Sequence, residues 1–150
     1  MAVTPSAISY STIVDSSQGA LVSILKDDDT IADYTTNVFD GVPTSLLRGT
    51  GFPYVVVHTP TLKEDRYTQS RFRVMLDFRI QIYDKKESNL RPLADAVRNC
   101  LKTYQSYERA YRLTNFTINS TDLGREFLPD EGSTPVWVYT INVEFRWVGT

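Results

Sequence analysis

The segment "RFRVMLDFRIQIYD", residues 71–84, alternates apolar and polar side chains over its whole length. Its apolar positions recur at every second residue from Phe72 to Ile82, and only Met75 departs from the alternation. Side chains of a β-strand point alternately to the two faces of a sheet, so this period of two predicts one long strand with a buried and a wetted face. The wetted face then carries Arg71, Arg73 and Arg79, with Asp77 between them.

The segment "VWVYTINVEFRWV", residues 136–148, has the same pattern and predicts a second long strand. One face takes Trp137, Tyr139, Ile141, Val143, Phe145 and Trp147, and the other takes Asn142, Glu144 and Arg146, with Val136 and Val138 opening it. Two further strands are predicted at "PYVVVH", residues 53–58, and "RLTNFTIN", residues 112–119, because β-branched and aromatic residues favour strands.

Two helices are predicted from apolar residues at three-to-four spacing. The first covers Ile13 to Lys26 and stops before three aspartates, 27–29, because acids oppose the dipole at a helix C-terminus. Among these, Asp29 is the favoured N-cap of a short turn that follows. The second helix carries the stripe from Leu90 to Tyr104, with Ser88 or Asn89 as its N-cap and Pro92 in its first turn.

The order α-β-β-α-β-β predicts a single α+β domain over residues 1–150, a two-layer structure. Its four-stranded, mostly antiparallel sheet has long hairpin strands and both helices on one face. Residues 59–70 extend the strands into an arm or form a surface loop, and residues 120–135 form a second polar loop. If the second helix runs back along the sheet, the connections around Lys63 and Glu126 emerge at opposite ends.

Composition gives an ordinary globular chain: 150 residues, 41% hydrophobic, 23% charged and a net charge of −2. The single cysteine, Cys100, excludes an internal disulfide. The first residues show no signal peptide, and no apolar run approaches the roughly 20 residues of a membrane span. We therefore expect a cytosolic chain without membrane contact.

No constellation for catalysis, metal or cofactor binding stands out. His58 is the only histidine, and Cys100 lies beside an apolar helical stripe where packing is the default role. The Gly-x-Gly of "RGTGFP" precedes a strand, so it does not fit a dinucleotide-binding loop. The aspartates 27–29 lack calcium-loop spacing, and the acids Glu126, Asp130 and Glu131 better fit a charged rim. We expect no enzymatic activity and no cofactor.

A nucleic-acid site on the arginine-bearing face is a weaker hypothesis. Tyr67 and Tyr83 accompany the arginines, as in sheet-based single-strand binders. However, Asp77 interrupts the row and the chain is acidic, which favours a polar sheet face or a protein contact.

Both long strands are also longer than the helices that could cover them. The exposed face of the sheet is expected to carry four apolar or aromatic residues: Val136, Val138, Met75 and Tyr83. This surplus predicts a homo-oligomer whose interfaces complete the sheets.

The chain resembles the tail-terminator, or tail-completion, family of tailed bacteriophages. The resemblance lies in "ALVSILKDDDTIADY" leading to "NVFDGVP", then "FPYVVVH", the long alternating strand, and the helix "LRPLADAVRNCLKTY" before two closing strands. It implies a hexameric ring at the head-proximal end of the tail tube, which ends tube polymerisation and joins the tail to the head connector. It also implies that genomic DNA passes through the channel without sequence-specific binding, and that the protein is in the virion after assembly in the host cytoplasm.

Three alternatives remain open from the sequence. Another neck, connector or head-completion component belongs to the same class, as does a tail-tube protein, and a small cytosolic α+β binding module or enzyme belongs to a different one. The residues expected to contact a neighbouring subunit, the tube or the connector lie in the two long connections and on the wetted strand face. They are Lys63, Glu64, Asp65, Arg66, Tyr67, Arg71, Arg73, Arg79, Arg125, Glu126, Phe127, Asp130 and Glu131.

Overall fold

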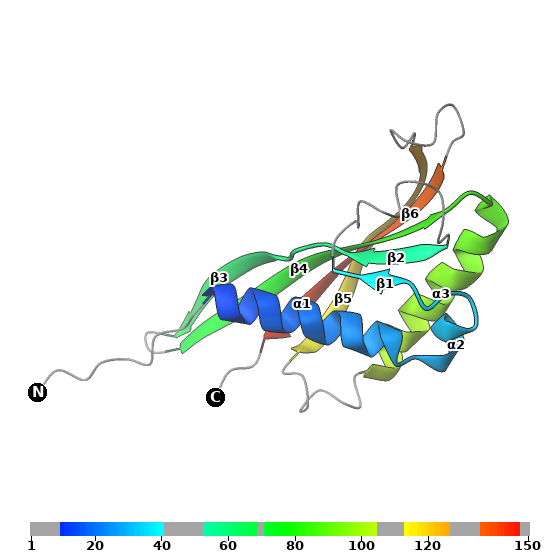
Figure 1. Cartoon of the computed structure of the whole chain (residues 1–150). Coiled ribbons are helices and arrows are strands. Elements are labelled where there is room, and N and C mark those ends of the chain that lie inside the picture. Colours follow the sequence, from blue (N-terminus) through cyan, green and yellow to red (C-terminus); the bar gives the residue numbers. More distant parts are fainter. Residues whose placement is uncertain (1–9, 41–52, 69–70, 105–112, 127–135, 148–150) are drawn as a thin grey trace, which may run out of the picture.

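The computed structural model describes residues 10–40, 53–68, 71–104, 113–126 and 136–147. The elements along the chain are α1 (Tyr10–Lys26), α2 (Asp29–Ala32), β1 (Val38–Phe39), β2 (Tyr54–Val57), β3 (Thr61–Thr68), β4 (Arg71–Asp84), α3 (Glu87–Tyr104), β5 (Leu113–Glu126) and β6 (Val136–Trp147). The long strand β4 has the bounds that its alternation predicts. Together the elements form the expected α+β structure, with helices and sheet in two layers (Figure 1).

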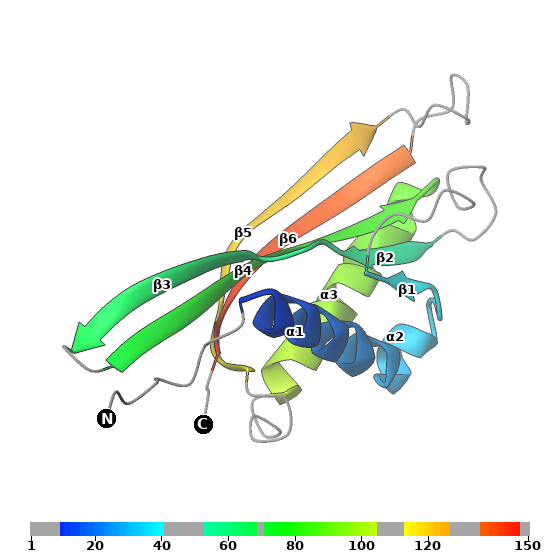
Figure 2. The same ribbon diagram turned by 60° about the vertical axis from the view of Figure 1, so that its left-hand side comes forward.

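The main core lies between the sheet and the helices, which cover one face (Figure 2). Every second residue of β4 points into it, and these side chains are at most 3% exposed: Val74, Leu76, Phe78, Ile80 and Ile82. Ile141, Val143 and Phe145 of β6 join them, as their alternation predicts. Phe78 and Phe145 meet edge to face, with ring centroids 5.9 Å apart. The periodicity of the two long strands therefore identifies the helix-covered face correctly.

The described residues form a sheet of six strands, in the order β1-β2-β4-β6-β5, with β3 also paired to β4. The pair β1–β2 is parallel, and the other neighbouring strands are antiparallel. The expectation of four strands was therefore wrong. It missed β1 because two residues are too few to show a period, and it missed β3 because "TLKEDRYT" has no regular apolar alternation.

One edge of β4 is occupied by two successive segments of chain. Tyr54–Val57 pair with Ile80–Tyr83, and Thr61–Thr68 pair with Arg71–Asp77. Between the two segments, the His58 amide donates to the Arg79 carbonyl at 3.0 Å. Thr61–Thr68 thus form an arm with β4, the first of the two alternatives left open by the sequence, whereas residues 69 and 70 lie outside the described residues.

The strand β5 is longer than expected and reaches Glu126, so the predicted loop at 120–135 was wrong in its first part. Residues 120–126 are polar apart from Leu123 and Gly124, so they show no apolar alternation that would have predicted the continuing strand. The ladder with β6 shifts register between Thr114 and Thr117 and again between Ile118 and Ser120. From Thr121 to Glu126 the pairing is regular.

The predicted directions of the strands are confirmed. Both β4 and β5 run antiparallel to β6, so they point the same way. The beginning of β4 and the end of β5 consequently lie at opposite ends of the molecule (Figure 1).

Three helix boundaries differ from their predictions, and the first is the start of α1, which lies at Tyr10 and not at Ile13. The N-cap of α2 is Asp28 and not Asp29, since its Oδ1 accepts the Ile31 amide at 2.9 Å. The helix α3 begins at Glu87, so neither Ser88 nor Asn89 is its N-cap and Pro92 lies beyond its first turn. Asp84 supports this earlier start, because its carboxylate accepts the Lys86 amide and the Asn89 side-chain amide.

A second apolar cluster lies on the helix-free face of the sheet. It comprises Tyr54, Val56, Tyr83, Val136 and Val138, each at most 4% exposed. The expectation that Tyr83, Val136 and Val138 are exposed was therefore wrong, and Met75 is half-buried. The sequence shows these residues only as breaks in a polar face, because their neighbours Tyr54 and Val56 lie in a strand 27 or more residues earlier in the chain.

Candidate interaction surface

The most prominent candidate surface is the arm formed by β3 and the first part of β4. Pairing of β4 with β6 begins at Val74, so Arg71–Arg73 of β4 pair with β3 alone among the described residues. The arm extends away from the helices at one end of the sheet (Figure 2). It brings most of the predicted contact residues together: Lys63, Glu64, Asp65, Arg66, Tyr67, Arg71 and Arg73.

Charges of both signs alternate on the helix-free face at the base of the arm. Lys63 Nζ lies 3.2 Å from Asp77 Oδ2, and the two side chains are 65% and 31% exposed. On the neighbouring strand, Glu144 lies opposite Asp77, and Arg146 lies opposite Met75. Because the charges are mixed, this surface is suited to ion pairs with a complementary protein surface and not to a continuous row of phosphates.

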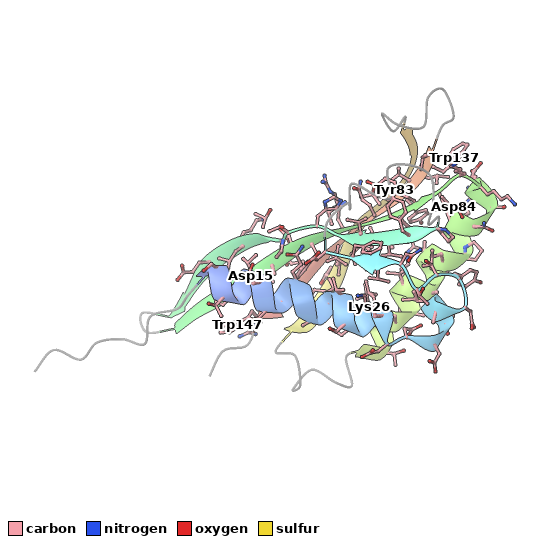
Figure 3. The ribbon with its side chains drawn as sticks, in the orientation of Figure 1. Asp15, Lys26, Tyr83, Asp84, Trp137 and Trp147 are labelled. Carbon is pink, nitrogen blue, oxygen red and sulfur yellow. The ribbon has the colours of Figure 1, made fainter. Side chains whose placement is uncertain are left out.

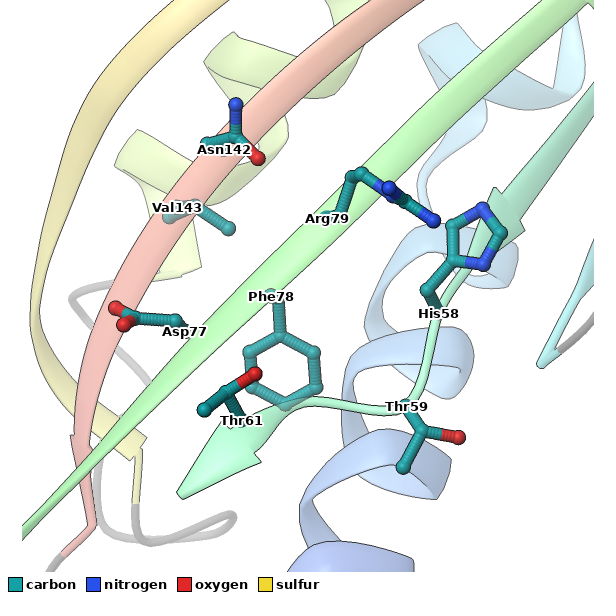
Figure 4. Close-up of a pocket in the computed structure, with 8 residues that line it drawn as sticks. All are labelled: His58, Thr59, Thr61, Asp77, Phe78, Arg79, Asn142 and Val143. Atoms are coloured by element: carbon teal, nitrogen blue, oxygen red, sulfur yellow. The ribbon is translucent and has the colours of Figure 1, made fainter. Parts of the chain in front are cut away.

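Arg79 lies farther along the same face and lines a groove of about 580 Å³. The groove opens where the chain passes from β2 to β3 (Figure 4). Its other lining residues are His58, Thr59, Thr61, Asp77, Phe78, Asn142 and Val143. Arg79 is exposed, so the groove presents a cation within a lining of hydroxyl, amide and carboxylate groups.

His58 belongs to a hydrogen-bond network on the sheet. Its Nε2 lies 2.6 Å from Gln81 Oε1, which also accepts the Tyr83 hydroxyl at 2.8 Å. The Gln81 side-chain amide donates to Thr140 Oγ1 at 3.3 Å. The network ties β2, β4 and β6 together, which is the structural role that a lone strand histidine most often has.

The opposite end of the molecule carries the other predicted contact residues. Arg125 and Glu126 are the last residues of β5 and lie opposite Trp137 and Val136 of β6. Phe127, Asp130 and Glu131 lie outside the described residues. The candidate residues thus form two groups at opposite ends of the sheet, with Arg79 between them, and not one site.

Cys100 is buried in the core, on the face of α3 that meets α1. Its Sγ lies 3.7 Å from the Ile24 carbonyl oxygen. Burial, together with the nearby Asp28 carboxylate, raises the pKa of the Cys100 thiol to about 12. The thiol is therefore protonated at neutral pH and is packed as an apolar side chain.

The described residues show neither a metal-binding cluster nor a membrane-spanning helix. Within these ranges, no three or more His, Cys, Asp and Glu side chains gather in a way that could hold a metal ion. None of the described helices is long and apolar enough to cross a bilayer.

These features define a two-layer α+β protein with a projecting β-arm. No family model matches the chain, and no curated protein matches its sequence. Among solved structures, a chain of the virion of a native gene transfer agent particle has a similar fold, with a TM-score of 0.69 at 17% sequence identity. The match covers 94% of this chain and 100% of that chain, so the whole architecture is shared.

Proposed function

We propose that this protein is a structural component of a tailed, phage-like virion and that it terminates the tail. The observation that carries the proposal is the end-to-end similarity of fold to a chain of a gene transfer agent virion. The similarity includes all of the neighbour's chain, so it is not limited to a common sheet motif. The sequence resemblance to tail terminators supplies the specific role within the virion.

In this role, copies of the chain form a ring, a hexamer, at the head-proximal end of the tail tube. The ring ends tube polymerisation and provides the surface for the head connector or a head-completion protein. The placement of the candidate contacts supports this arrangement. One group lies on the arm and the other at the end of β5, so a single subunit can contact two partners along one axis.

Genomic DNA passes through the centre of the proposed ring without sequence-specific binding. The mixed charges of the helix-free face support passage over tight binding, because Asp77 and Glu144 lie among the cations Lys63, Arg79 and Arg146. DNA affinity rises with the number of phosphates that cations neutralise, and acids within the same patch lower that number.

The proposed role is contact and not catalysis, and needs no cofactor. The surroundings of the two side chains best suited to catalysis, a thiol and an imidazole, support this view. Cys100 is buried with a raised pKa, and the ring of His58 is held by Gln81 within the sheet.

Deleting the gene from a producing strain tests the role directly. Loss of a terminator gives tail tubes of uncontrolled length, and supplying the wild-type chain restores a uniform length in electron micrographs. Tubes of normal length that fail to join heads would instead assign the chain to the connector. A chain that stays monomeric by light scattering, even with purified tail tubes, would contradict both virion roles.

A further inference from the structure

The described sheet has three edge strands, β1, β3 and β5. Because β1 has only two residues, β3 and β5 are the two long free edges that could accept another strand. On one side, β3 pairs with β4 alone, and on the other side β5 pairs with β6 alone. Free strand edges expose unpaired amide and carbonyl groups and are the usual sites at which sheets extend between subunits.

The two free edges have compatible directions. Because β3 is antiparallel to β4, and β4 points the same way as β5, the edges β3 and β5 run antiparallel to each other. A second copy placed beside the first in the same orientation therefore continues the antiparallel order. Such a head-to-tail contact uses two different surfaces, and it closes into a ring when the rotation between copies allows it.

The helices leave the sheet unevenly covered, and the uncovered side is the one next to β5. The helix α3 packs on β4 and β6, and α1 packs on β1 and β2, whereas neither packs extensively on β5 among the described residues. Ile118 and Leu123 of β5 are accordingly half-buried, as are Trp137 and Trp147 at the two ends of β6 (Figure 3). We refer to these four residues as the β5 margin.

The opposite edge of the sheet carries a helix and an apolar side chain that could cover the β5 margin. The helix α1 begins beside β3 and lies on the same face as the margin (Figures 1 and 2). Leu62 of β3 is also half-buried against the main core. When β3 of a second copy adds to β5, its Leu62 and α1 come next to the β5 margin and extend the apolar core across the boundary. Pairing two β5 edges by a two-fold axis would bring the two margins together with no helix to cover either of them.

One register fits both edges best. The regular part of β5 runs from Thr121 to Glu126, whereas its first half contains the register shifts that disfavour a further strand. Placing Leu62 opposite Leu123 joins the two half-buried leucines on the helix-covered face. It also places Thr61 opposite Gly124, and Lys63 opposite the position of the acidic residue Asp122.

This register has the geometry of a closed structure. Within one copy Thr61 lies level with Asp77, and Gly124 lies level with Tyr83 through the β5–β6 and β4–β6 ladders. The distance from Asp77 to Tyr83 along β4 is about 20 Å, and the four strands of each repeat are together about 19 Å wide. The resulting stagger tilts the strands by about 45°, similar to the tilt of roughly 35–45° in closed β-barrels.

We infer that copies of this chain join by adding β3 of one subunit to the Thr121–Glu126 edge of the next. The partner is a second copy of the same chain, and the sheet becomes continuous around the assembly. The inference rests on the proposed ring, but it specifies the contact that builds the ring.

Cysteine crosslinking tests the contact with three single variants: Thr61→Cys, Gly124→Cys and Thr117→Cys. Thr61 and Thr117 are exposed, and a Cβ at Gly124 meets no atom within 4 Å, so all three tolerate the change. The native Cys100 stays in place because it is buried. The probe is a short bismaleimide, added to single variants, to equimolar mixtures and to the Thr61→Cys/Gly124→Cys double variant.

Mixing Thr61→Cys with Gly124→Cys is expected to give covalent dimers roughly tenfold or more above either variant alone, since a paired edge holds the thiols at high effective concentration. The double variant should give a ladder of higher oligomers. Mixing Thr61→Cys with Thr117→Cys is the matched control, and it should give far less dimer because Thr117 lies in the irregular half of β5.

Dimers from Thr61→Cys alone or Gly124→Cys alone at the level of the mixture would overturn the inference in favour of a two-fold contact. Equal crosslinking to Thr117 would overturn the register. An oligomer with the mass of a ring in light scattering, but with no crosslinking above the wild-type level, would overturn the edge pairing and leave the proposed function intact. A chain that stays monomeric in the presence of tail tubes would contradict both.

Discussion

Tyr54 and Tyr83 stack on the helix-free face of the sheet, with ring centroids 4.9 Å apart and an angle of 21° between their planes. They lie directly opposite each other in the β2–β4 ladder and are both buried. The pair therefore fixes β2 against the long strand on the face that has no helix, where aromatic cross-strand pairs are among the more stabilising contacts.

Replacing Tyr83 by alanine should remove the stack and destabilise the protein by about 3 kcal/mol, the usual cost of truncating a buried aromatic side chain. Tyr83→Phe keeps the ring and loses the hydrogen bond to Gln81, which costs about 1 kcal/mol. Urea unfolding followed by fluorescence measures both. If the two variants lose equal stability, the hydroxyl and not the ring is the main contribution.

Removing the N-cap of α2 by Asp28→Ala should cost about 1 kcal/mol, because the Ile31 amide loses its acceptor. Asp28→Asn retains an acceptor oxygen and should lose less. The matched control is Asp27→Ala, an exposed position outside the cap, with a change within about 0.5 kcal/mol. A loss at Asp27 equal to that at Asp28 would mean that removal of acidic charge, and not of the cap, is responsible.

The Cys100 thiol should be inert in the folded protein. With a pKa of about 12 it carries almost no thiolate at pH 8, so a maleimide reacts only after denaturant is added. Asp28→Asn removes one of the groups that raise this pKa and should increase the rate of reaction. Rapid labelling of the native wild-type chain would show that the thiol is accessible.

Because the pKa of the Cys100 thiol is raised in the folded state, the protein should lose stability at alkaline pH. Folding raises the pKa from about 9 in the open chain to about 12, so the folded state favours the protonated thiol. This contribution is complete below pH 9 and decreases as the pH rises toward 12. Urea midpoints at pH 7 to 10.5 should therefore fall more steeply for the wild type than for Cys100→Ala, and parallel curves would contradict the assignment.

Reversing the charge of Lys63 separates assembly from folding. The ion pair with Asp77 is largely exposed, so Lys63→Glu should change stability by no more than about 1 kcal/mol. It should nevertheless weaken assembly, because Lys63 lies on the edge proposed to meet the next copy. Lys102→Glu on α3 is the matched control for net charge, since Lys102 is exposed and far from the arm in sequence. Equal assembly of both variants, measured by light scattering, would remove Lys63 from the interface.

The sequence predicts those elements in which one face is buried and the other is exposed, because this difference produces a periodic pattern of apolar residues. β4 and β6 have a buried and a wetted side along most of their length, and their alternation gave both the strand bounds and the helix-covered face. The stripe of α3 likewise located the helix. Such patterns arise from burial on one face, so a single sequence contains them.

Other parts depend on partners that lie far away in the chain. The polar arm strand β3 exists because it pairs with β4, and its own residues carry no strand period. Val136 and Val138 look like apolar residues on a wetted face, but in the fold they meet Tyr54, Val56 and Tyr83. The strand directions confirm that the connections around Lys63 and Glu126 lie at opposite ends, whereas the contacts expected of their residues stay a prediction. The His58–Gln81–Tyr83 network could not be predicted, because it depends on the register of the sheet.

The length of β4 also affects how the molecule responds to mechanical force. One strand runs from the arm at Arg71 to the start of α3 beyond Asp84, and from Val74 onward it is hydrogen-bonded to β6. Antiparallel hydrogen bonds lie perpendicular to the strands. Tension applied between the two ends of the subunit therefore loads many of these bonds in shear at once and does not open them one by one. A subunit with this geometry resists extension along the direction of β4.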